Sequence, residues 1–255
     1  MNLKSFLCHG AAALVTLCAF GTAQASTLFV SGTDAVSLHG DTSYINPVVN
    51  QLVAGAGSNA VLVVGSGGSL QYTGGIATLD FSSGATLDAR SLSGYEAIIF
   101  SSPCCSDPAA RLGSRAADVA AYVAAGGGLY IEDYQGNVAW DAILGIPSGS
   151  GGPSVVLGGV STGADCIDPG VSTASGLAFG FNASYSEGCF VHQAYSGTFW
   201  SGQGYFALQT MTDASKWVVM AQGFTEPGTV PEPASIALVG LALLGMGAAR
   251  RARRG

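Results

Sequence analysis

Two short apolar segments bracket this chain, and they limit its folded part to the roughly 200 residues between them. The first of them lies in residues 1–25, which carry Lys4, an apolar run over 11–20 and then Ala23-Gln24-Ala25. A basic residue, a short apolar core and an A-x-A sequence are the parts of a secretory signal peptide, so signal peptidase is expected to cut after Ala25. An uncleaved N-terminal membrane helix is the alternative, which the short apolar run disfavours.

The second apolar segment lies near the C-terminus, between two prolines and a basic cluster. Pro231-Glu232-Pro233 is followed by an apolar stretch over 236–249 and by four arginines within 250–254. The fourteen apolar residues span about 21 Å as a helix, short of a roughly 30 Å hydrocarbon core. Snorkelling arginines and local thinning of the bilayer can supply the difference. Because clustered arginines stay in the cytoplasm, we expect a transmembrane helix that holds the body on the periplasmic side of the inner membrane.

This order of features resembles the PEP-CTERM sorting signal of Gram-negative bacteria that produce exopolysaccharide. The resemblance implies recognition by an exosortase, a membrane cysteine protease, and cleavage near Pro231-Glu232-Pro233 during sorting to the surface. The two prolines also stop a helix from continuing through the site, which leaves an extended segment accessible to a protease. A plain single-span anchor with an incidental Pro-Glu-Pro is the alternative. The expected organisation is a signal peptide at 1–25, an exported domain at 26–226 and a sorting signal at 227–255.

Charge in the body is sparse and negative. Charged residues make up 10% of the chain, against about 25% in typical soluble domains. Residues 26–226 hold fifteen acidic residues and four basic ones, a formal balance of −11; the basic residues are Arg90, Arg111, Arg115 and Lys216. Such a surface offers no basic stripe to a phosphate backbone, so nucleic acid is not an expected partner.

The first part of the body alternates strand-like and helix-like segments. Strands are predicted at 27–31, 60–65, 96–101 and 128–132. The second and third of these are apolar at consecutive positions, as in strands buried on both faces. Helices are predicted from Asn46 to Gly55, with Pro47 at the first helical position, and from Asp107 to Ala125, before three glycines. This order predicts an α/β fold with a doubly wound, mainly parallel sheet.

Two segments carry a resemblance to a known fold family. The stretches Gly94–Ser101 and Ala121–Ile131 resemble the class I glutamine amidotransferase-like, or flavodoxin-like, α/β family. An amidotransferase of this class carries its nucleophile in a G-x-C-x-G elbow, whereas the corresponding turn here, Tyr130 to Gly136, contains neither Cys nor Ser. The resemblance therefore implies the fold without the amidotransferase chemistry. An ordinary flavodoxin-like scaffold with no ligand is equally consistent.

Beyond Ile146 the sequence is rich in Gly, Ser and Thr and predicts a long β-rich excursion over 148–206, after which a strand at 217–221 rejoins the sheet. Four cysteines remain once the signal peptide has gone: Cys104, Cys105, Cys166 and Cys189. An even number in an oxidising compartment predicts disulfides, and adjacent cysteines rarely pair with each other. We expect two bridges from the adjacent cysteines to the two later ones, in either pairing. A zinc site is the alternative, which the absence of C-x-x-C disfavours.

Polar residues follow the predicted strands at their carboxyl ends, where open α/β sheets bind ligands. The candidate pocket consists of Asp34, His39, Glu132 and Asp133. Acidic side chains beside a histidine can bind a metal or act as general acid and base. Turns after strands also favour Asp and Ser without any function. No metal or cofactor is expected.

The sequence as a whole favours an exported cell-surface or extracellular-matrix protein that is anchored in the inner membrane until an exosortase processes it. A non-catalytic body associated with exopolysaccharide or biofilm is the favoured interpretation. An extracellular hydrolase, or a carbohydrate-binding or metal-binding protein that uses the acids at the strand ends, is the alternative.

Overall fold

The computed structural model describes the folded body with several gaps. The described residues are 26–34, 42–54, 58–65, 70–101, 108–132, 138–146, 170–181, 191 and 193–223. They form a mixed α/β fold around a mostly parallel sheet, which confirms that part of the predicted fold class. The signal peptide, the four cysteines of the body and the sorting segment lie outside the described residues.

No helix within the described ranges combines the length and the apolar character that crossing a membrane requires.

The sheet contains parallel and antiparallel strands in the order β3-β2-β4-β5-β1-β9-β8-β6, with β7 paired to β9. The parallel strands are β1 (Leu28–Ser31), β2 (Ala60–Val64), β3 (Thr78–Phe81), β4 (Ala97–Phe100) and β5 (Gly128–Glu132). The antiparallel strands are β6 (Val171–Ser172), β7 (Tyr195–Ser196), β8 (Phe206–Thr210) and β9 (Lys216–Gln222). Strand β1 joins the two halves, because it pairs in parallel with β5 and antiparallel with β9.

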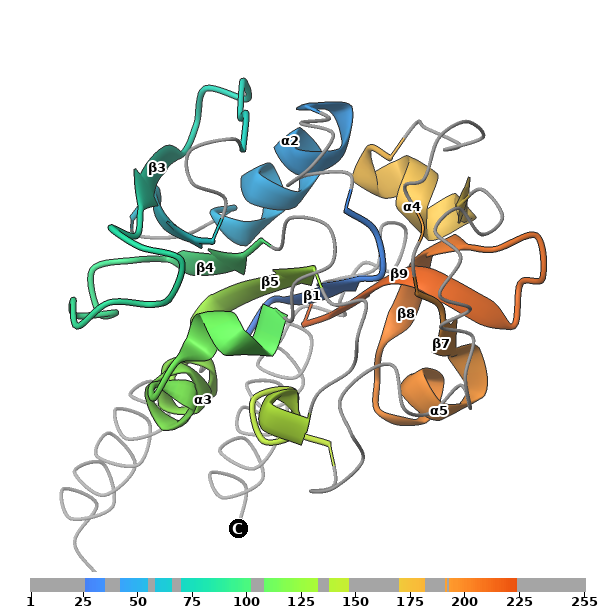
Figure 1. Ribbon diagram of the computed structural model, residues 1–255. Helices are drawn as coiled ribbons and strands as arrows, with labels where there is room; N and C mark the ends of the chain where they lie inside the picture. The colour runs from blue at the N-terminus through green and yellow to red at the C-terminus, as the bar shows by residue number, and fades with distance from the viewer. Residues whose placement is uncertain are drawn as a thin grey trace, which may run out of the picture. The chain divides into compact units, whose positions relative to one another are not determined.

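Helices cover both faces of this sheet (Figure 1). Helices α2 (Thr42–Leu52) and α4 (Ala174–Phe179) lie over one face. The other face is covered by α3 (Ala116–Ala124), α5 (Gly197–Gly202) and the 3-10 helices η1 (Pro108–Leu112) and η2 (Val138–Trp140). Cover on both sides leaves the central strands inaccessible to water, and β1, β2, β4 and β5 are buried almost throughout.

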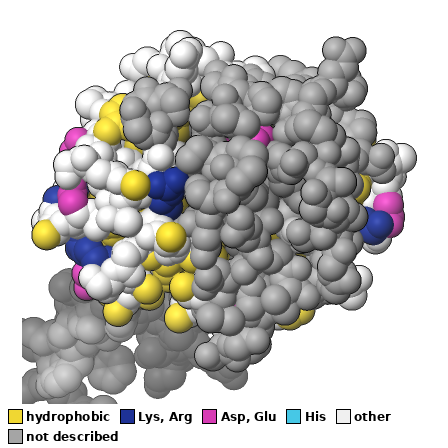
Figure 2. All heavy atoms as spheres, in the orientation of Figure 1, with side chains coloured by type: hydrophobic (Ala, Val, Ile, Leu, Met, Phe, Trp, Pro, Cys, Tyr) yellow, Lys and Arg dark blue, Asp and Glu magenta, His cyan; other side chains and the backbone are white. Residues whose placement is uncertain are grey.

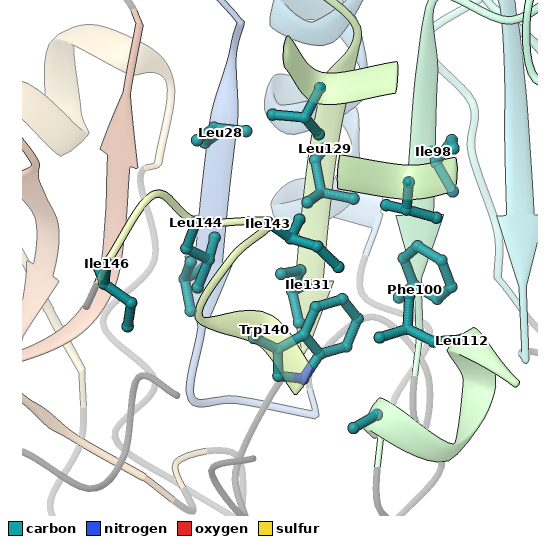
Figure 3. Close-up of a cluster of buried hydrophobic side chains, with 14 of the residues drawn as sticks. Leu28, Ile98, Phe100, Leu112, Leu129, Ile131, Trp140, Ile143, Leu144 and Ile146 are labelled. Carbon is teal, nitrogen blue, oxygen red and sulfur yellow. The ribbon is translucent and has the colours of Figure 1, made fainter. Parts of the chain in front are cut away.

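The face under α3 carries the main apolar core. Ile131 of β5 and Phe100 of β4 point into it (Figure 3), and Val30 of β1 belongs to the same cluster. Trp140 is fully buried beside them, and its ring meets Phe100 edge-on at a centroid distance of 5.4 Å. The side chains that fill this face are apolar, so it serves packing rather than chemistry.

The opposite face is built from aromatic side chains. Phe29 contacts the ring of Tyr130 at 6.4 Å and that of Phe179 at 5.3 Å. Phe181 stacks on Tyr44 of α2 at 4.8 Å and lies 5.2 Å from Phe179. The aromatic cluster therefore ties α2 and the segment of α4 to the two central strands.

The predicted start of the first helix was wrong. Helix α2 begins at Thr42 rather than Asn46, which puts Pro47 inside the helix instead of at its first position. The additional turn buries Tyr44 and Ile45 completely. Burying two large side chains stabilises the turn enough to offset the hydrogen bond that proline cannot donate.

The single helix predicted over 107–125 was also wrong, since the described chain forms η1 and then α3 with a break between them. Gly113, with φ of +55°, lies at the break. A residue in the left-handed backbone conformation ends the run of helical hydrogen bonds, and glycine adopts this conformation without steric cost. The predicted glycine stop after α3 is confirmed, because Gly126 has φ of +103° and its N–H donates to the carbonyl of Val123 at 2.9 Å.

Strand β3 was not predicted from the sequence, whereas the strand that became β9 was. Strand β3 falls in a stretch for which no strand was predicted, because its side chains are only alternately half-buried and form no apolar run. The strand predicted at 217–221 is β9, and it does rejoin the sheet. The described part of the excursion contains α4 and α5 beside two-residue strands, so it is less β-rich than predicted.

Candidate functional site

Buried polar side chains gather at the carboxyl ends of three neighbouring strands. Ser101 follows β4, Glu132 ends β5, and Ser31 ends β1; each is fully buried. Because these strands are parallel and adjacent, their ends meet at one edge of the sheet. That edge is where sheets of this kind hold ligands, so it is the candidate functional site.

Hydroxyl groups form a hydrogen-bonded chain within this site. The Ser31 hydroxyl lies 2.9 Å from the Thr33 hydroxyl and 2.9 Å from the Tyr44 hydroxyl of α2. The backbone N–H of Thr33 donates to the same serine oxygen at 3.2 Å. All three side chains are fully buried, so these hydrogen bonds replace the water that the hydroxyls lose on folding. The network fixes the first helix to the end of β1.

A carboxylate lies beside this network. Glu132 is the direct register partner of Ser31 across β1 and β5, and the Tyr130 hydroxyl donates to its Oε1 at 3.4 Å. Burial raises the pKa of Tyr130 well above its ordinary value, and the negative charge of Glu132 raises it further. Burial likewise raises the pKa of Tyr44, with hydrogen bonds from Ser31 and Thr33 opposing the shift. Both phenols are therefore neutral hydrogen-bond donors near neutral pH and cannot serve as bases.

The chain of the excursion crosses the end of β1 next to these groups. Gly32 donates its N–H to the carbonyl of Val218 at 2.9 Å and accepts from the N–H of Gln193 at 3.0 Å. A Cβ at position 32 would lie 2.1 Å from the Gln193 carbonyl oxygen, so only glycine permits this approach. Asp34, fully buried, comes two residues later, after a bridge between Thr33 and Val191.

Two buried polar atoms near these strand ends lack hydrogen bonds to the part of the chain that the structure describes. They are the Ser101 hydroxyl oxygen and the Gln193 side-chain oxygen Oε1. A buried polar atom without a partner costs about 1–3 kcal/mol, so native proteins usually supply water or a ligand to such atoms. Both atoms are therefore points at which a bound polar group would be stabilised.

The predicted pocket is only partly within the described residues. Asp34 and Glu132 lie at the ends of the adjacent strands β1 and β5 and are both buried. His39 and Asp133 lie outside the described residues, so the grouping of four side chains into one pocket stays a prediction. Within the described ranges no three His, Cys, Asp or Glu side chains form a metal-binding group.

The other predicted functional residues also lie outside the described ranges. These are Ala23 and Ala25 at the signal cleavage site, Pro231, Glu232 and Pro233 in the sorting motif, and Cys104, Cys105, Cys166 and Cys189. The disulfide pairing accordingly stays a prediction.

Sequence reasoning did not find Tyr44, Thr33 or Gln193. Tyr44 carried no signal because the predicted helix began after it. Thr33 and Gln193 become neighbours only through tertiary structure. The one sequence signal was Gly32, because a glycine next to a strand often marks the close approach of another backbone.

Three of the four basic residues of the body hold a second polar cluster together, at the β3 edge. Arg90 pairs with Asp88 at 2.7 Å and with Asp80 at 2.8 Å. Arg115 donates to the backbone carbonyl of Arg90 at 2.9 Å, and Arg111 donates to the carbonyl of Ala85 at 2.9 Å. These contacts anchor the segment between β3 and β4, so the cluster is structural.

The charges of this cluster neutralise one another. Hydrogen bonds from Arg90 lower the pKa of Asp88, and the hydrogen bond from Tyr95 followed by Arg90 lowers that of Asp80. Figure 2 shows the basic side chains on the described part of one face in small separate groups, several of them beside acidic side chains, with no continuous basic stripe there.

Comparison with known protein families finds a match for one short segment of the chain. Residues 229–254 match the PEP-CTERM protein-sorting motif. The match confirms the predicted sorting signal, and it implies an exported protein whose membrane-anchored precursor is processed by an exosortase on its way to the cell surface. No curated protein and no solved structure matches the chain, so the amidotransferase resemblance of the body stays a prediction.

Proposed function

We propose that this chain is a cell-surface or extracellular-matrix protein whose α/β body is non-catalytic and associates with exopolysaccharide or biofilm after sorting. The observation that carries the proposal is the PEP-CTERM motif at 229–254, since it defines the route of the protein. The body that travels this route has a formal balance of −11, which favours solubility in the extracellular space and contact with neutral polymers or divalent cations.

The buried polar edge supports a body without catalysis. Ser31, Thr33 and Tyr44 satisfy one another, and Glu132 receives a hydrogen bond from Tyr130. Polar groups in this arrangement specify one packing of α2 on the sheet. A general base must instead reach a substrate proton, and both Asp34 and Glu132 are fully buried in this fold.

Cell fractionation tests the proposal directly. In an exosortase-producing host, the wild-type chain should reach the surface fraction and co-sediment with purified exopolysaccharide. Substituting both Pro231→Ala and Pro233→Ala should leave it in the inner membrane, while the matched change Pro227→Ala, outside the motif, should not alter sorting. Equal distribution of all three proteins would contradict the sorting proposal, and failure of the surface protein to bind exopolysaccharide would contradict the matrix role.

A second candidate function rests on the position of the two acids. Asp34 and Glu132 follow neighbouring parallel strands at the edge where α/β sheets bind ligands, which favours an extracellular hydrolase or a carbohydrate-binding or metal-binding body. A polysaccharide hydrolysis assay on the wild type, Asp34→Asn and Glu132→Gln separates the two candidates. Activity that both substitutions abolish, with exposed Asp118→Asn as the matched control, would replace the non-catalytic proposal.

A further inference from the structure

The two ends of the described body meet at the edge of the sheet opposite to the polar site. Strand β1 begins at Leu28 and β9 ends at Gln222, and these two residues are register partners. A Cβ on Gly223 would lie only 1.8 Å from the carbonyl oxygen of Ser26, so the two backbones are in contact. The chain therefore enters and leaves the body at one place.

An apolar cavity of about 420 Å³ opens beside these ends, a size within the range of known ligand sites. Its floor consists of the buried side chains Leu28, Val123, Ile143 and Leu144. Figure 3 shows Leu28, Ile143 and Leu144 on the same side of the sheet. Ala124 at the end of α3 and Ala142 after η2 line the cavity from two elements and are exposed.

Among the described lining residues, the polar side chains of Ser26 and Gln222 already form hydrogen bonds within the protein. The Ser26 hydroxyl donates to the carbonyl of Val123, and the Gln222 side chain donates to the carbonyl of Gln203 at 2.7 Å. None of the described residues that line the cavity carries a charged side chain. A ligand in the cavity is stabilised mainly by burial of its apolar surface. The net negative charge of the body disfavours an anionic ligand.

The chain outside the described body sets the distance from this cavity to the membrane. The C-terminal apolar run begins at Ile236, thirteen residues after Gly223, and it is the connection that remains once signal peptidase has cut after Ala25. Fully extended, this connection reaches no more than about 45 Å. The edge of the sheet that bears the cavity is thus kept within reach of the bilayer for as long as the precursor remains inserted.

We propose that this cavity binds the acyl chain of a neutral or zwitterionic membrane lipid. The proposal rests on the proposed function in one respect, that a membrane-held precursor exists. The bound chain lies against the apolar floor, while the headgroup stays at the open mouth in water. Before processing, lipid binding holds the amino edge of the sheet toward the membrane and leaves the polar carboxyl edge facing away from it.

Photocrosslinking of the full-length precursor tests this site. The precursor is placed in phosphatidylcholine nanodiscs that contain a phosphatidylcholine with a diazirine at the end of one acyl chain, and labelled peptides are mapped after irradiation. We expect label on the peptides that contain Val123 and Ile143, as well as on the apolar segment 236–249. The same photoactivatable chain on phosphatidylglycerol should label the two cavity peptides less.

Variants that fill the cavity provide the decisive comparison. Ala124→Trp and Ala142→Trp narrow it from two different elements, and both residues are exposed, so folding should survive. If the tryptophan displaces two methylene groups of the bound acyl chain, and each contributes about a fourfold change in affinity, labelling of the cavity peptides falls by about tenfold or more. Ala117→Trp, an exposed position on the same helix that does not line the cavity, should keep the wild-type label.

Each outcome decides a separate claim. Label on 236–249 without label on the cavity peptides, or cavity label that neither filling variant reduces, overturns the lipid site. Label on the cavity without label on 236–249 leaves the lipid site standing and contradicts the membrane anchor. Absence of label on both contradicts both.

Discussion

The two faces of the sheet use the same strands for different purposes. Strand β1 sends Val30 to the face under α3 and Ser31 to the face under α2, and β5 likewise sends Ile131 to one and Glu132 to the other. The α3 face is an apolar core that Trp140 completes. The α2 face ends in hydroxyl groups and a carboxylate at the carboxyl edge of the sheet.

The two faces are therefore expected to contribute differently, one to the free energy of unfolding and the other to the placement of neighbouring elements. The α3 face consists mainly of apolar side chains, and its stabilising energy comes from their burial. The polar end of the α2 face contributes less to stability, because each hydrogen bond replaces one made to water. The apolar face is therefore expected to dominate the free energy of unfolding, and the polar end to determine how α2 and the excursion are placed.

The largest effect should come from the apolar face. Trp140→Ala removes a fully buried indole that packs against Phe100, and we expect the free energy of unfolding to fall by about 3–5 kcal/mol. Urea denaturation of the processed protein measures it. Leu177→Ala, at a side chain that is 54% exposed, should change it by less than about 0.5 kcal/mol. Equal losses in the two variants would mean that this face is not the main core.

A smaller loss is expected where the excursion crosses β1. Gly32→Ala places a Cβ against the Gln193 backbone and should lower the free energy of unfolding by about 2–3 kcal/mol. Gly84→Ala is the matched control, because a Cβ at position 84 has no heavy atom within 4 Å. Thermal unfolding of both variants gives the comparison, and a stable Gly32→Ala protein would show that residues 191–193 do not pack as described.

Removing one hydroxyl from each face compares the two directly. Tyr44→Phe deletes the hydrogen bond to Ser31 and should cost about 1 kcal/mol. Tyr205→Phe, within the apolar core, removes only a 3.5 Å contact to the carbonyl of Leu144 and should cost less. If urea denaturation finds the reverse order, the hydroxyl network of the α2 face contributes no specific stability.

The smallest effect should come from the Arg90 cluster, and it should depend on pH. The pKa values of Asp80 and Asp88 lie below their ordinary values in the folded protein. Their stabilising contribution is therefore present above about pH 4 and is lost as pH falls through the folded pKa values. Arg90→Gln should cost less than about 1 kcal/mol at pH 7, since these pairs are partly exposed. The variant should also lose less stability than wild type between about pH 5 and pH 2, and identical pH profiles would contradict this role for Arg90.

The predictable parts of the fold are those with a local signal. Consecutive apolar residues in Val61–Val64 and Ile98–Phe100 predict buried parallel strands, and Gly126 predicts the end of a helix. The start of α2 was not predictable from Pro47, because burial of Tyr44 by distant elements decides it. Strand β3 has no apolar run and depends on pairing with β2.

The candidate site was predictable only in outline. Parallel strands bring their carboxyl ends to one edge, which is enough to place Asp34 and Glu132 there. The partners of these residues come from elsewhere in the chain. Thr33 pairs with Val191, more than 150 residues away, and no local pattern in either segment records that contact.

Intact mass spectrometry of the protein from cells with and without exosortase tests the central claim, that the body works outside the cell after both terminal segments are removed. With exosortase, the account predicts a surface protein that begins at Ser26, ends near Pro231-Glu232-Pro233 and is four hydrogens lighter than its reduced form because of two disulfides. Without exosortase, the tail should remain attached. A full-length chain in the cytosol, with all its cysteines reduced in both strains, would contradict the account.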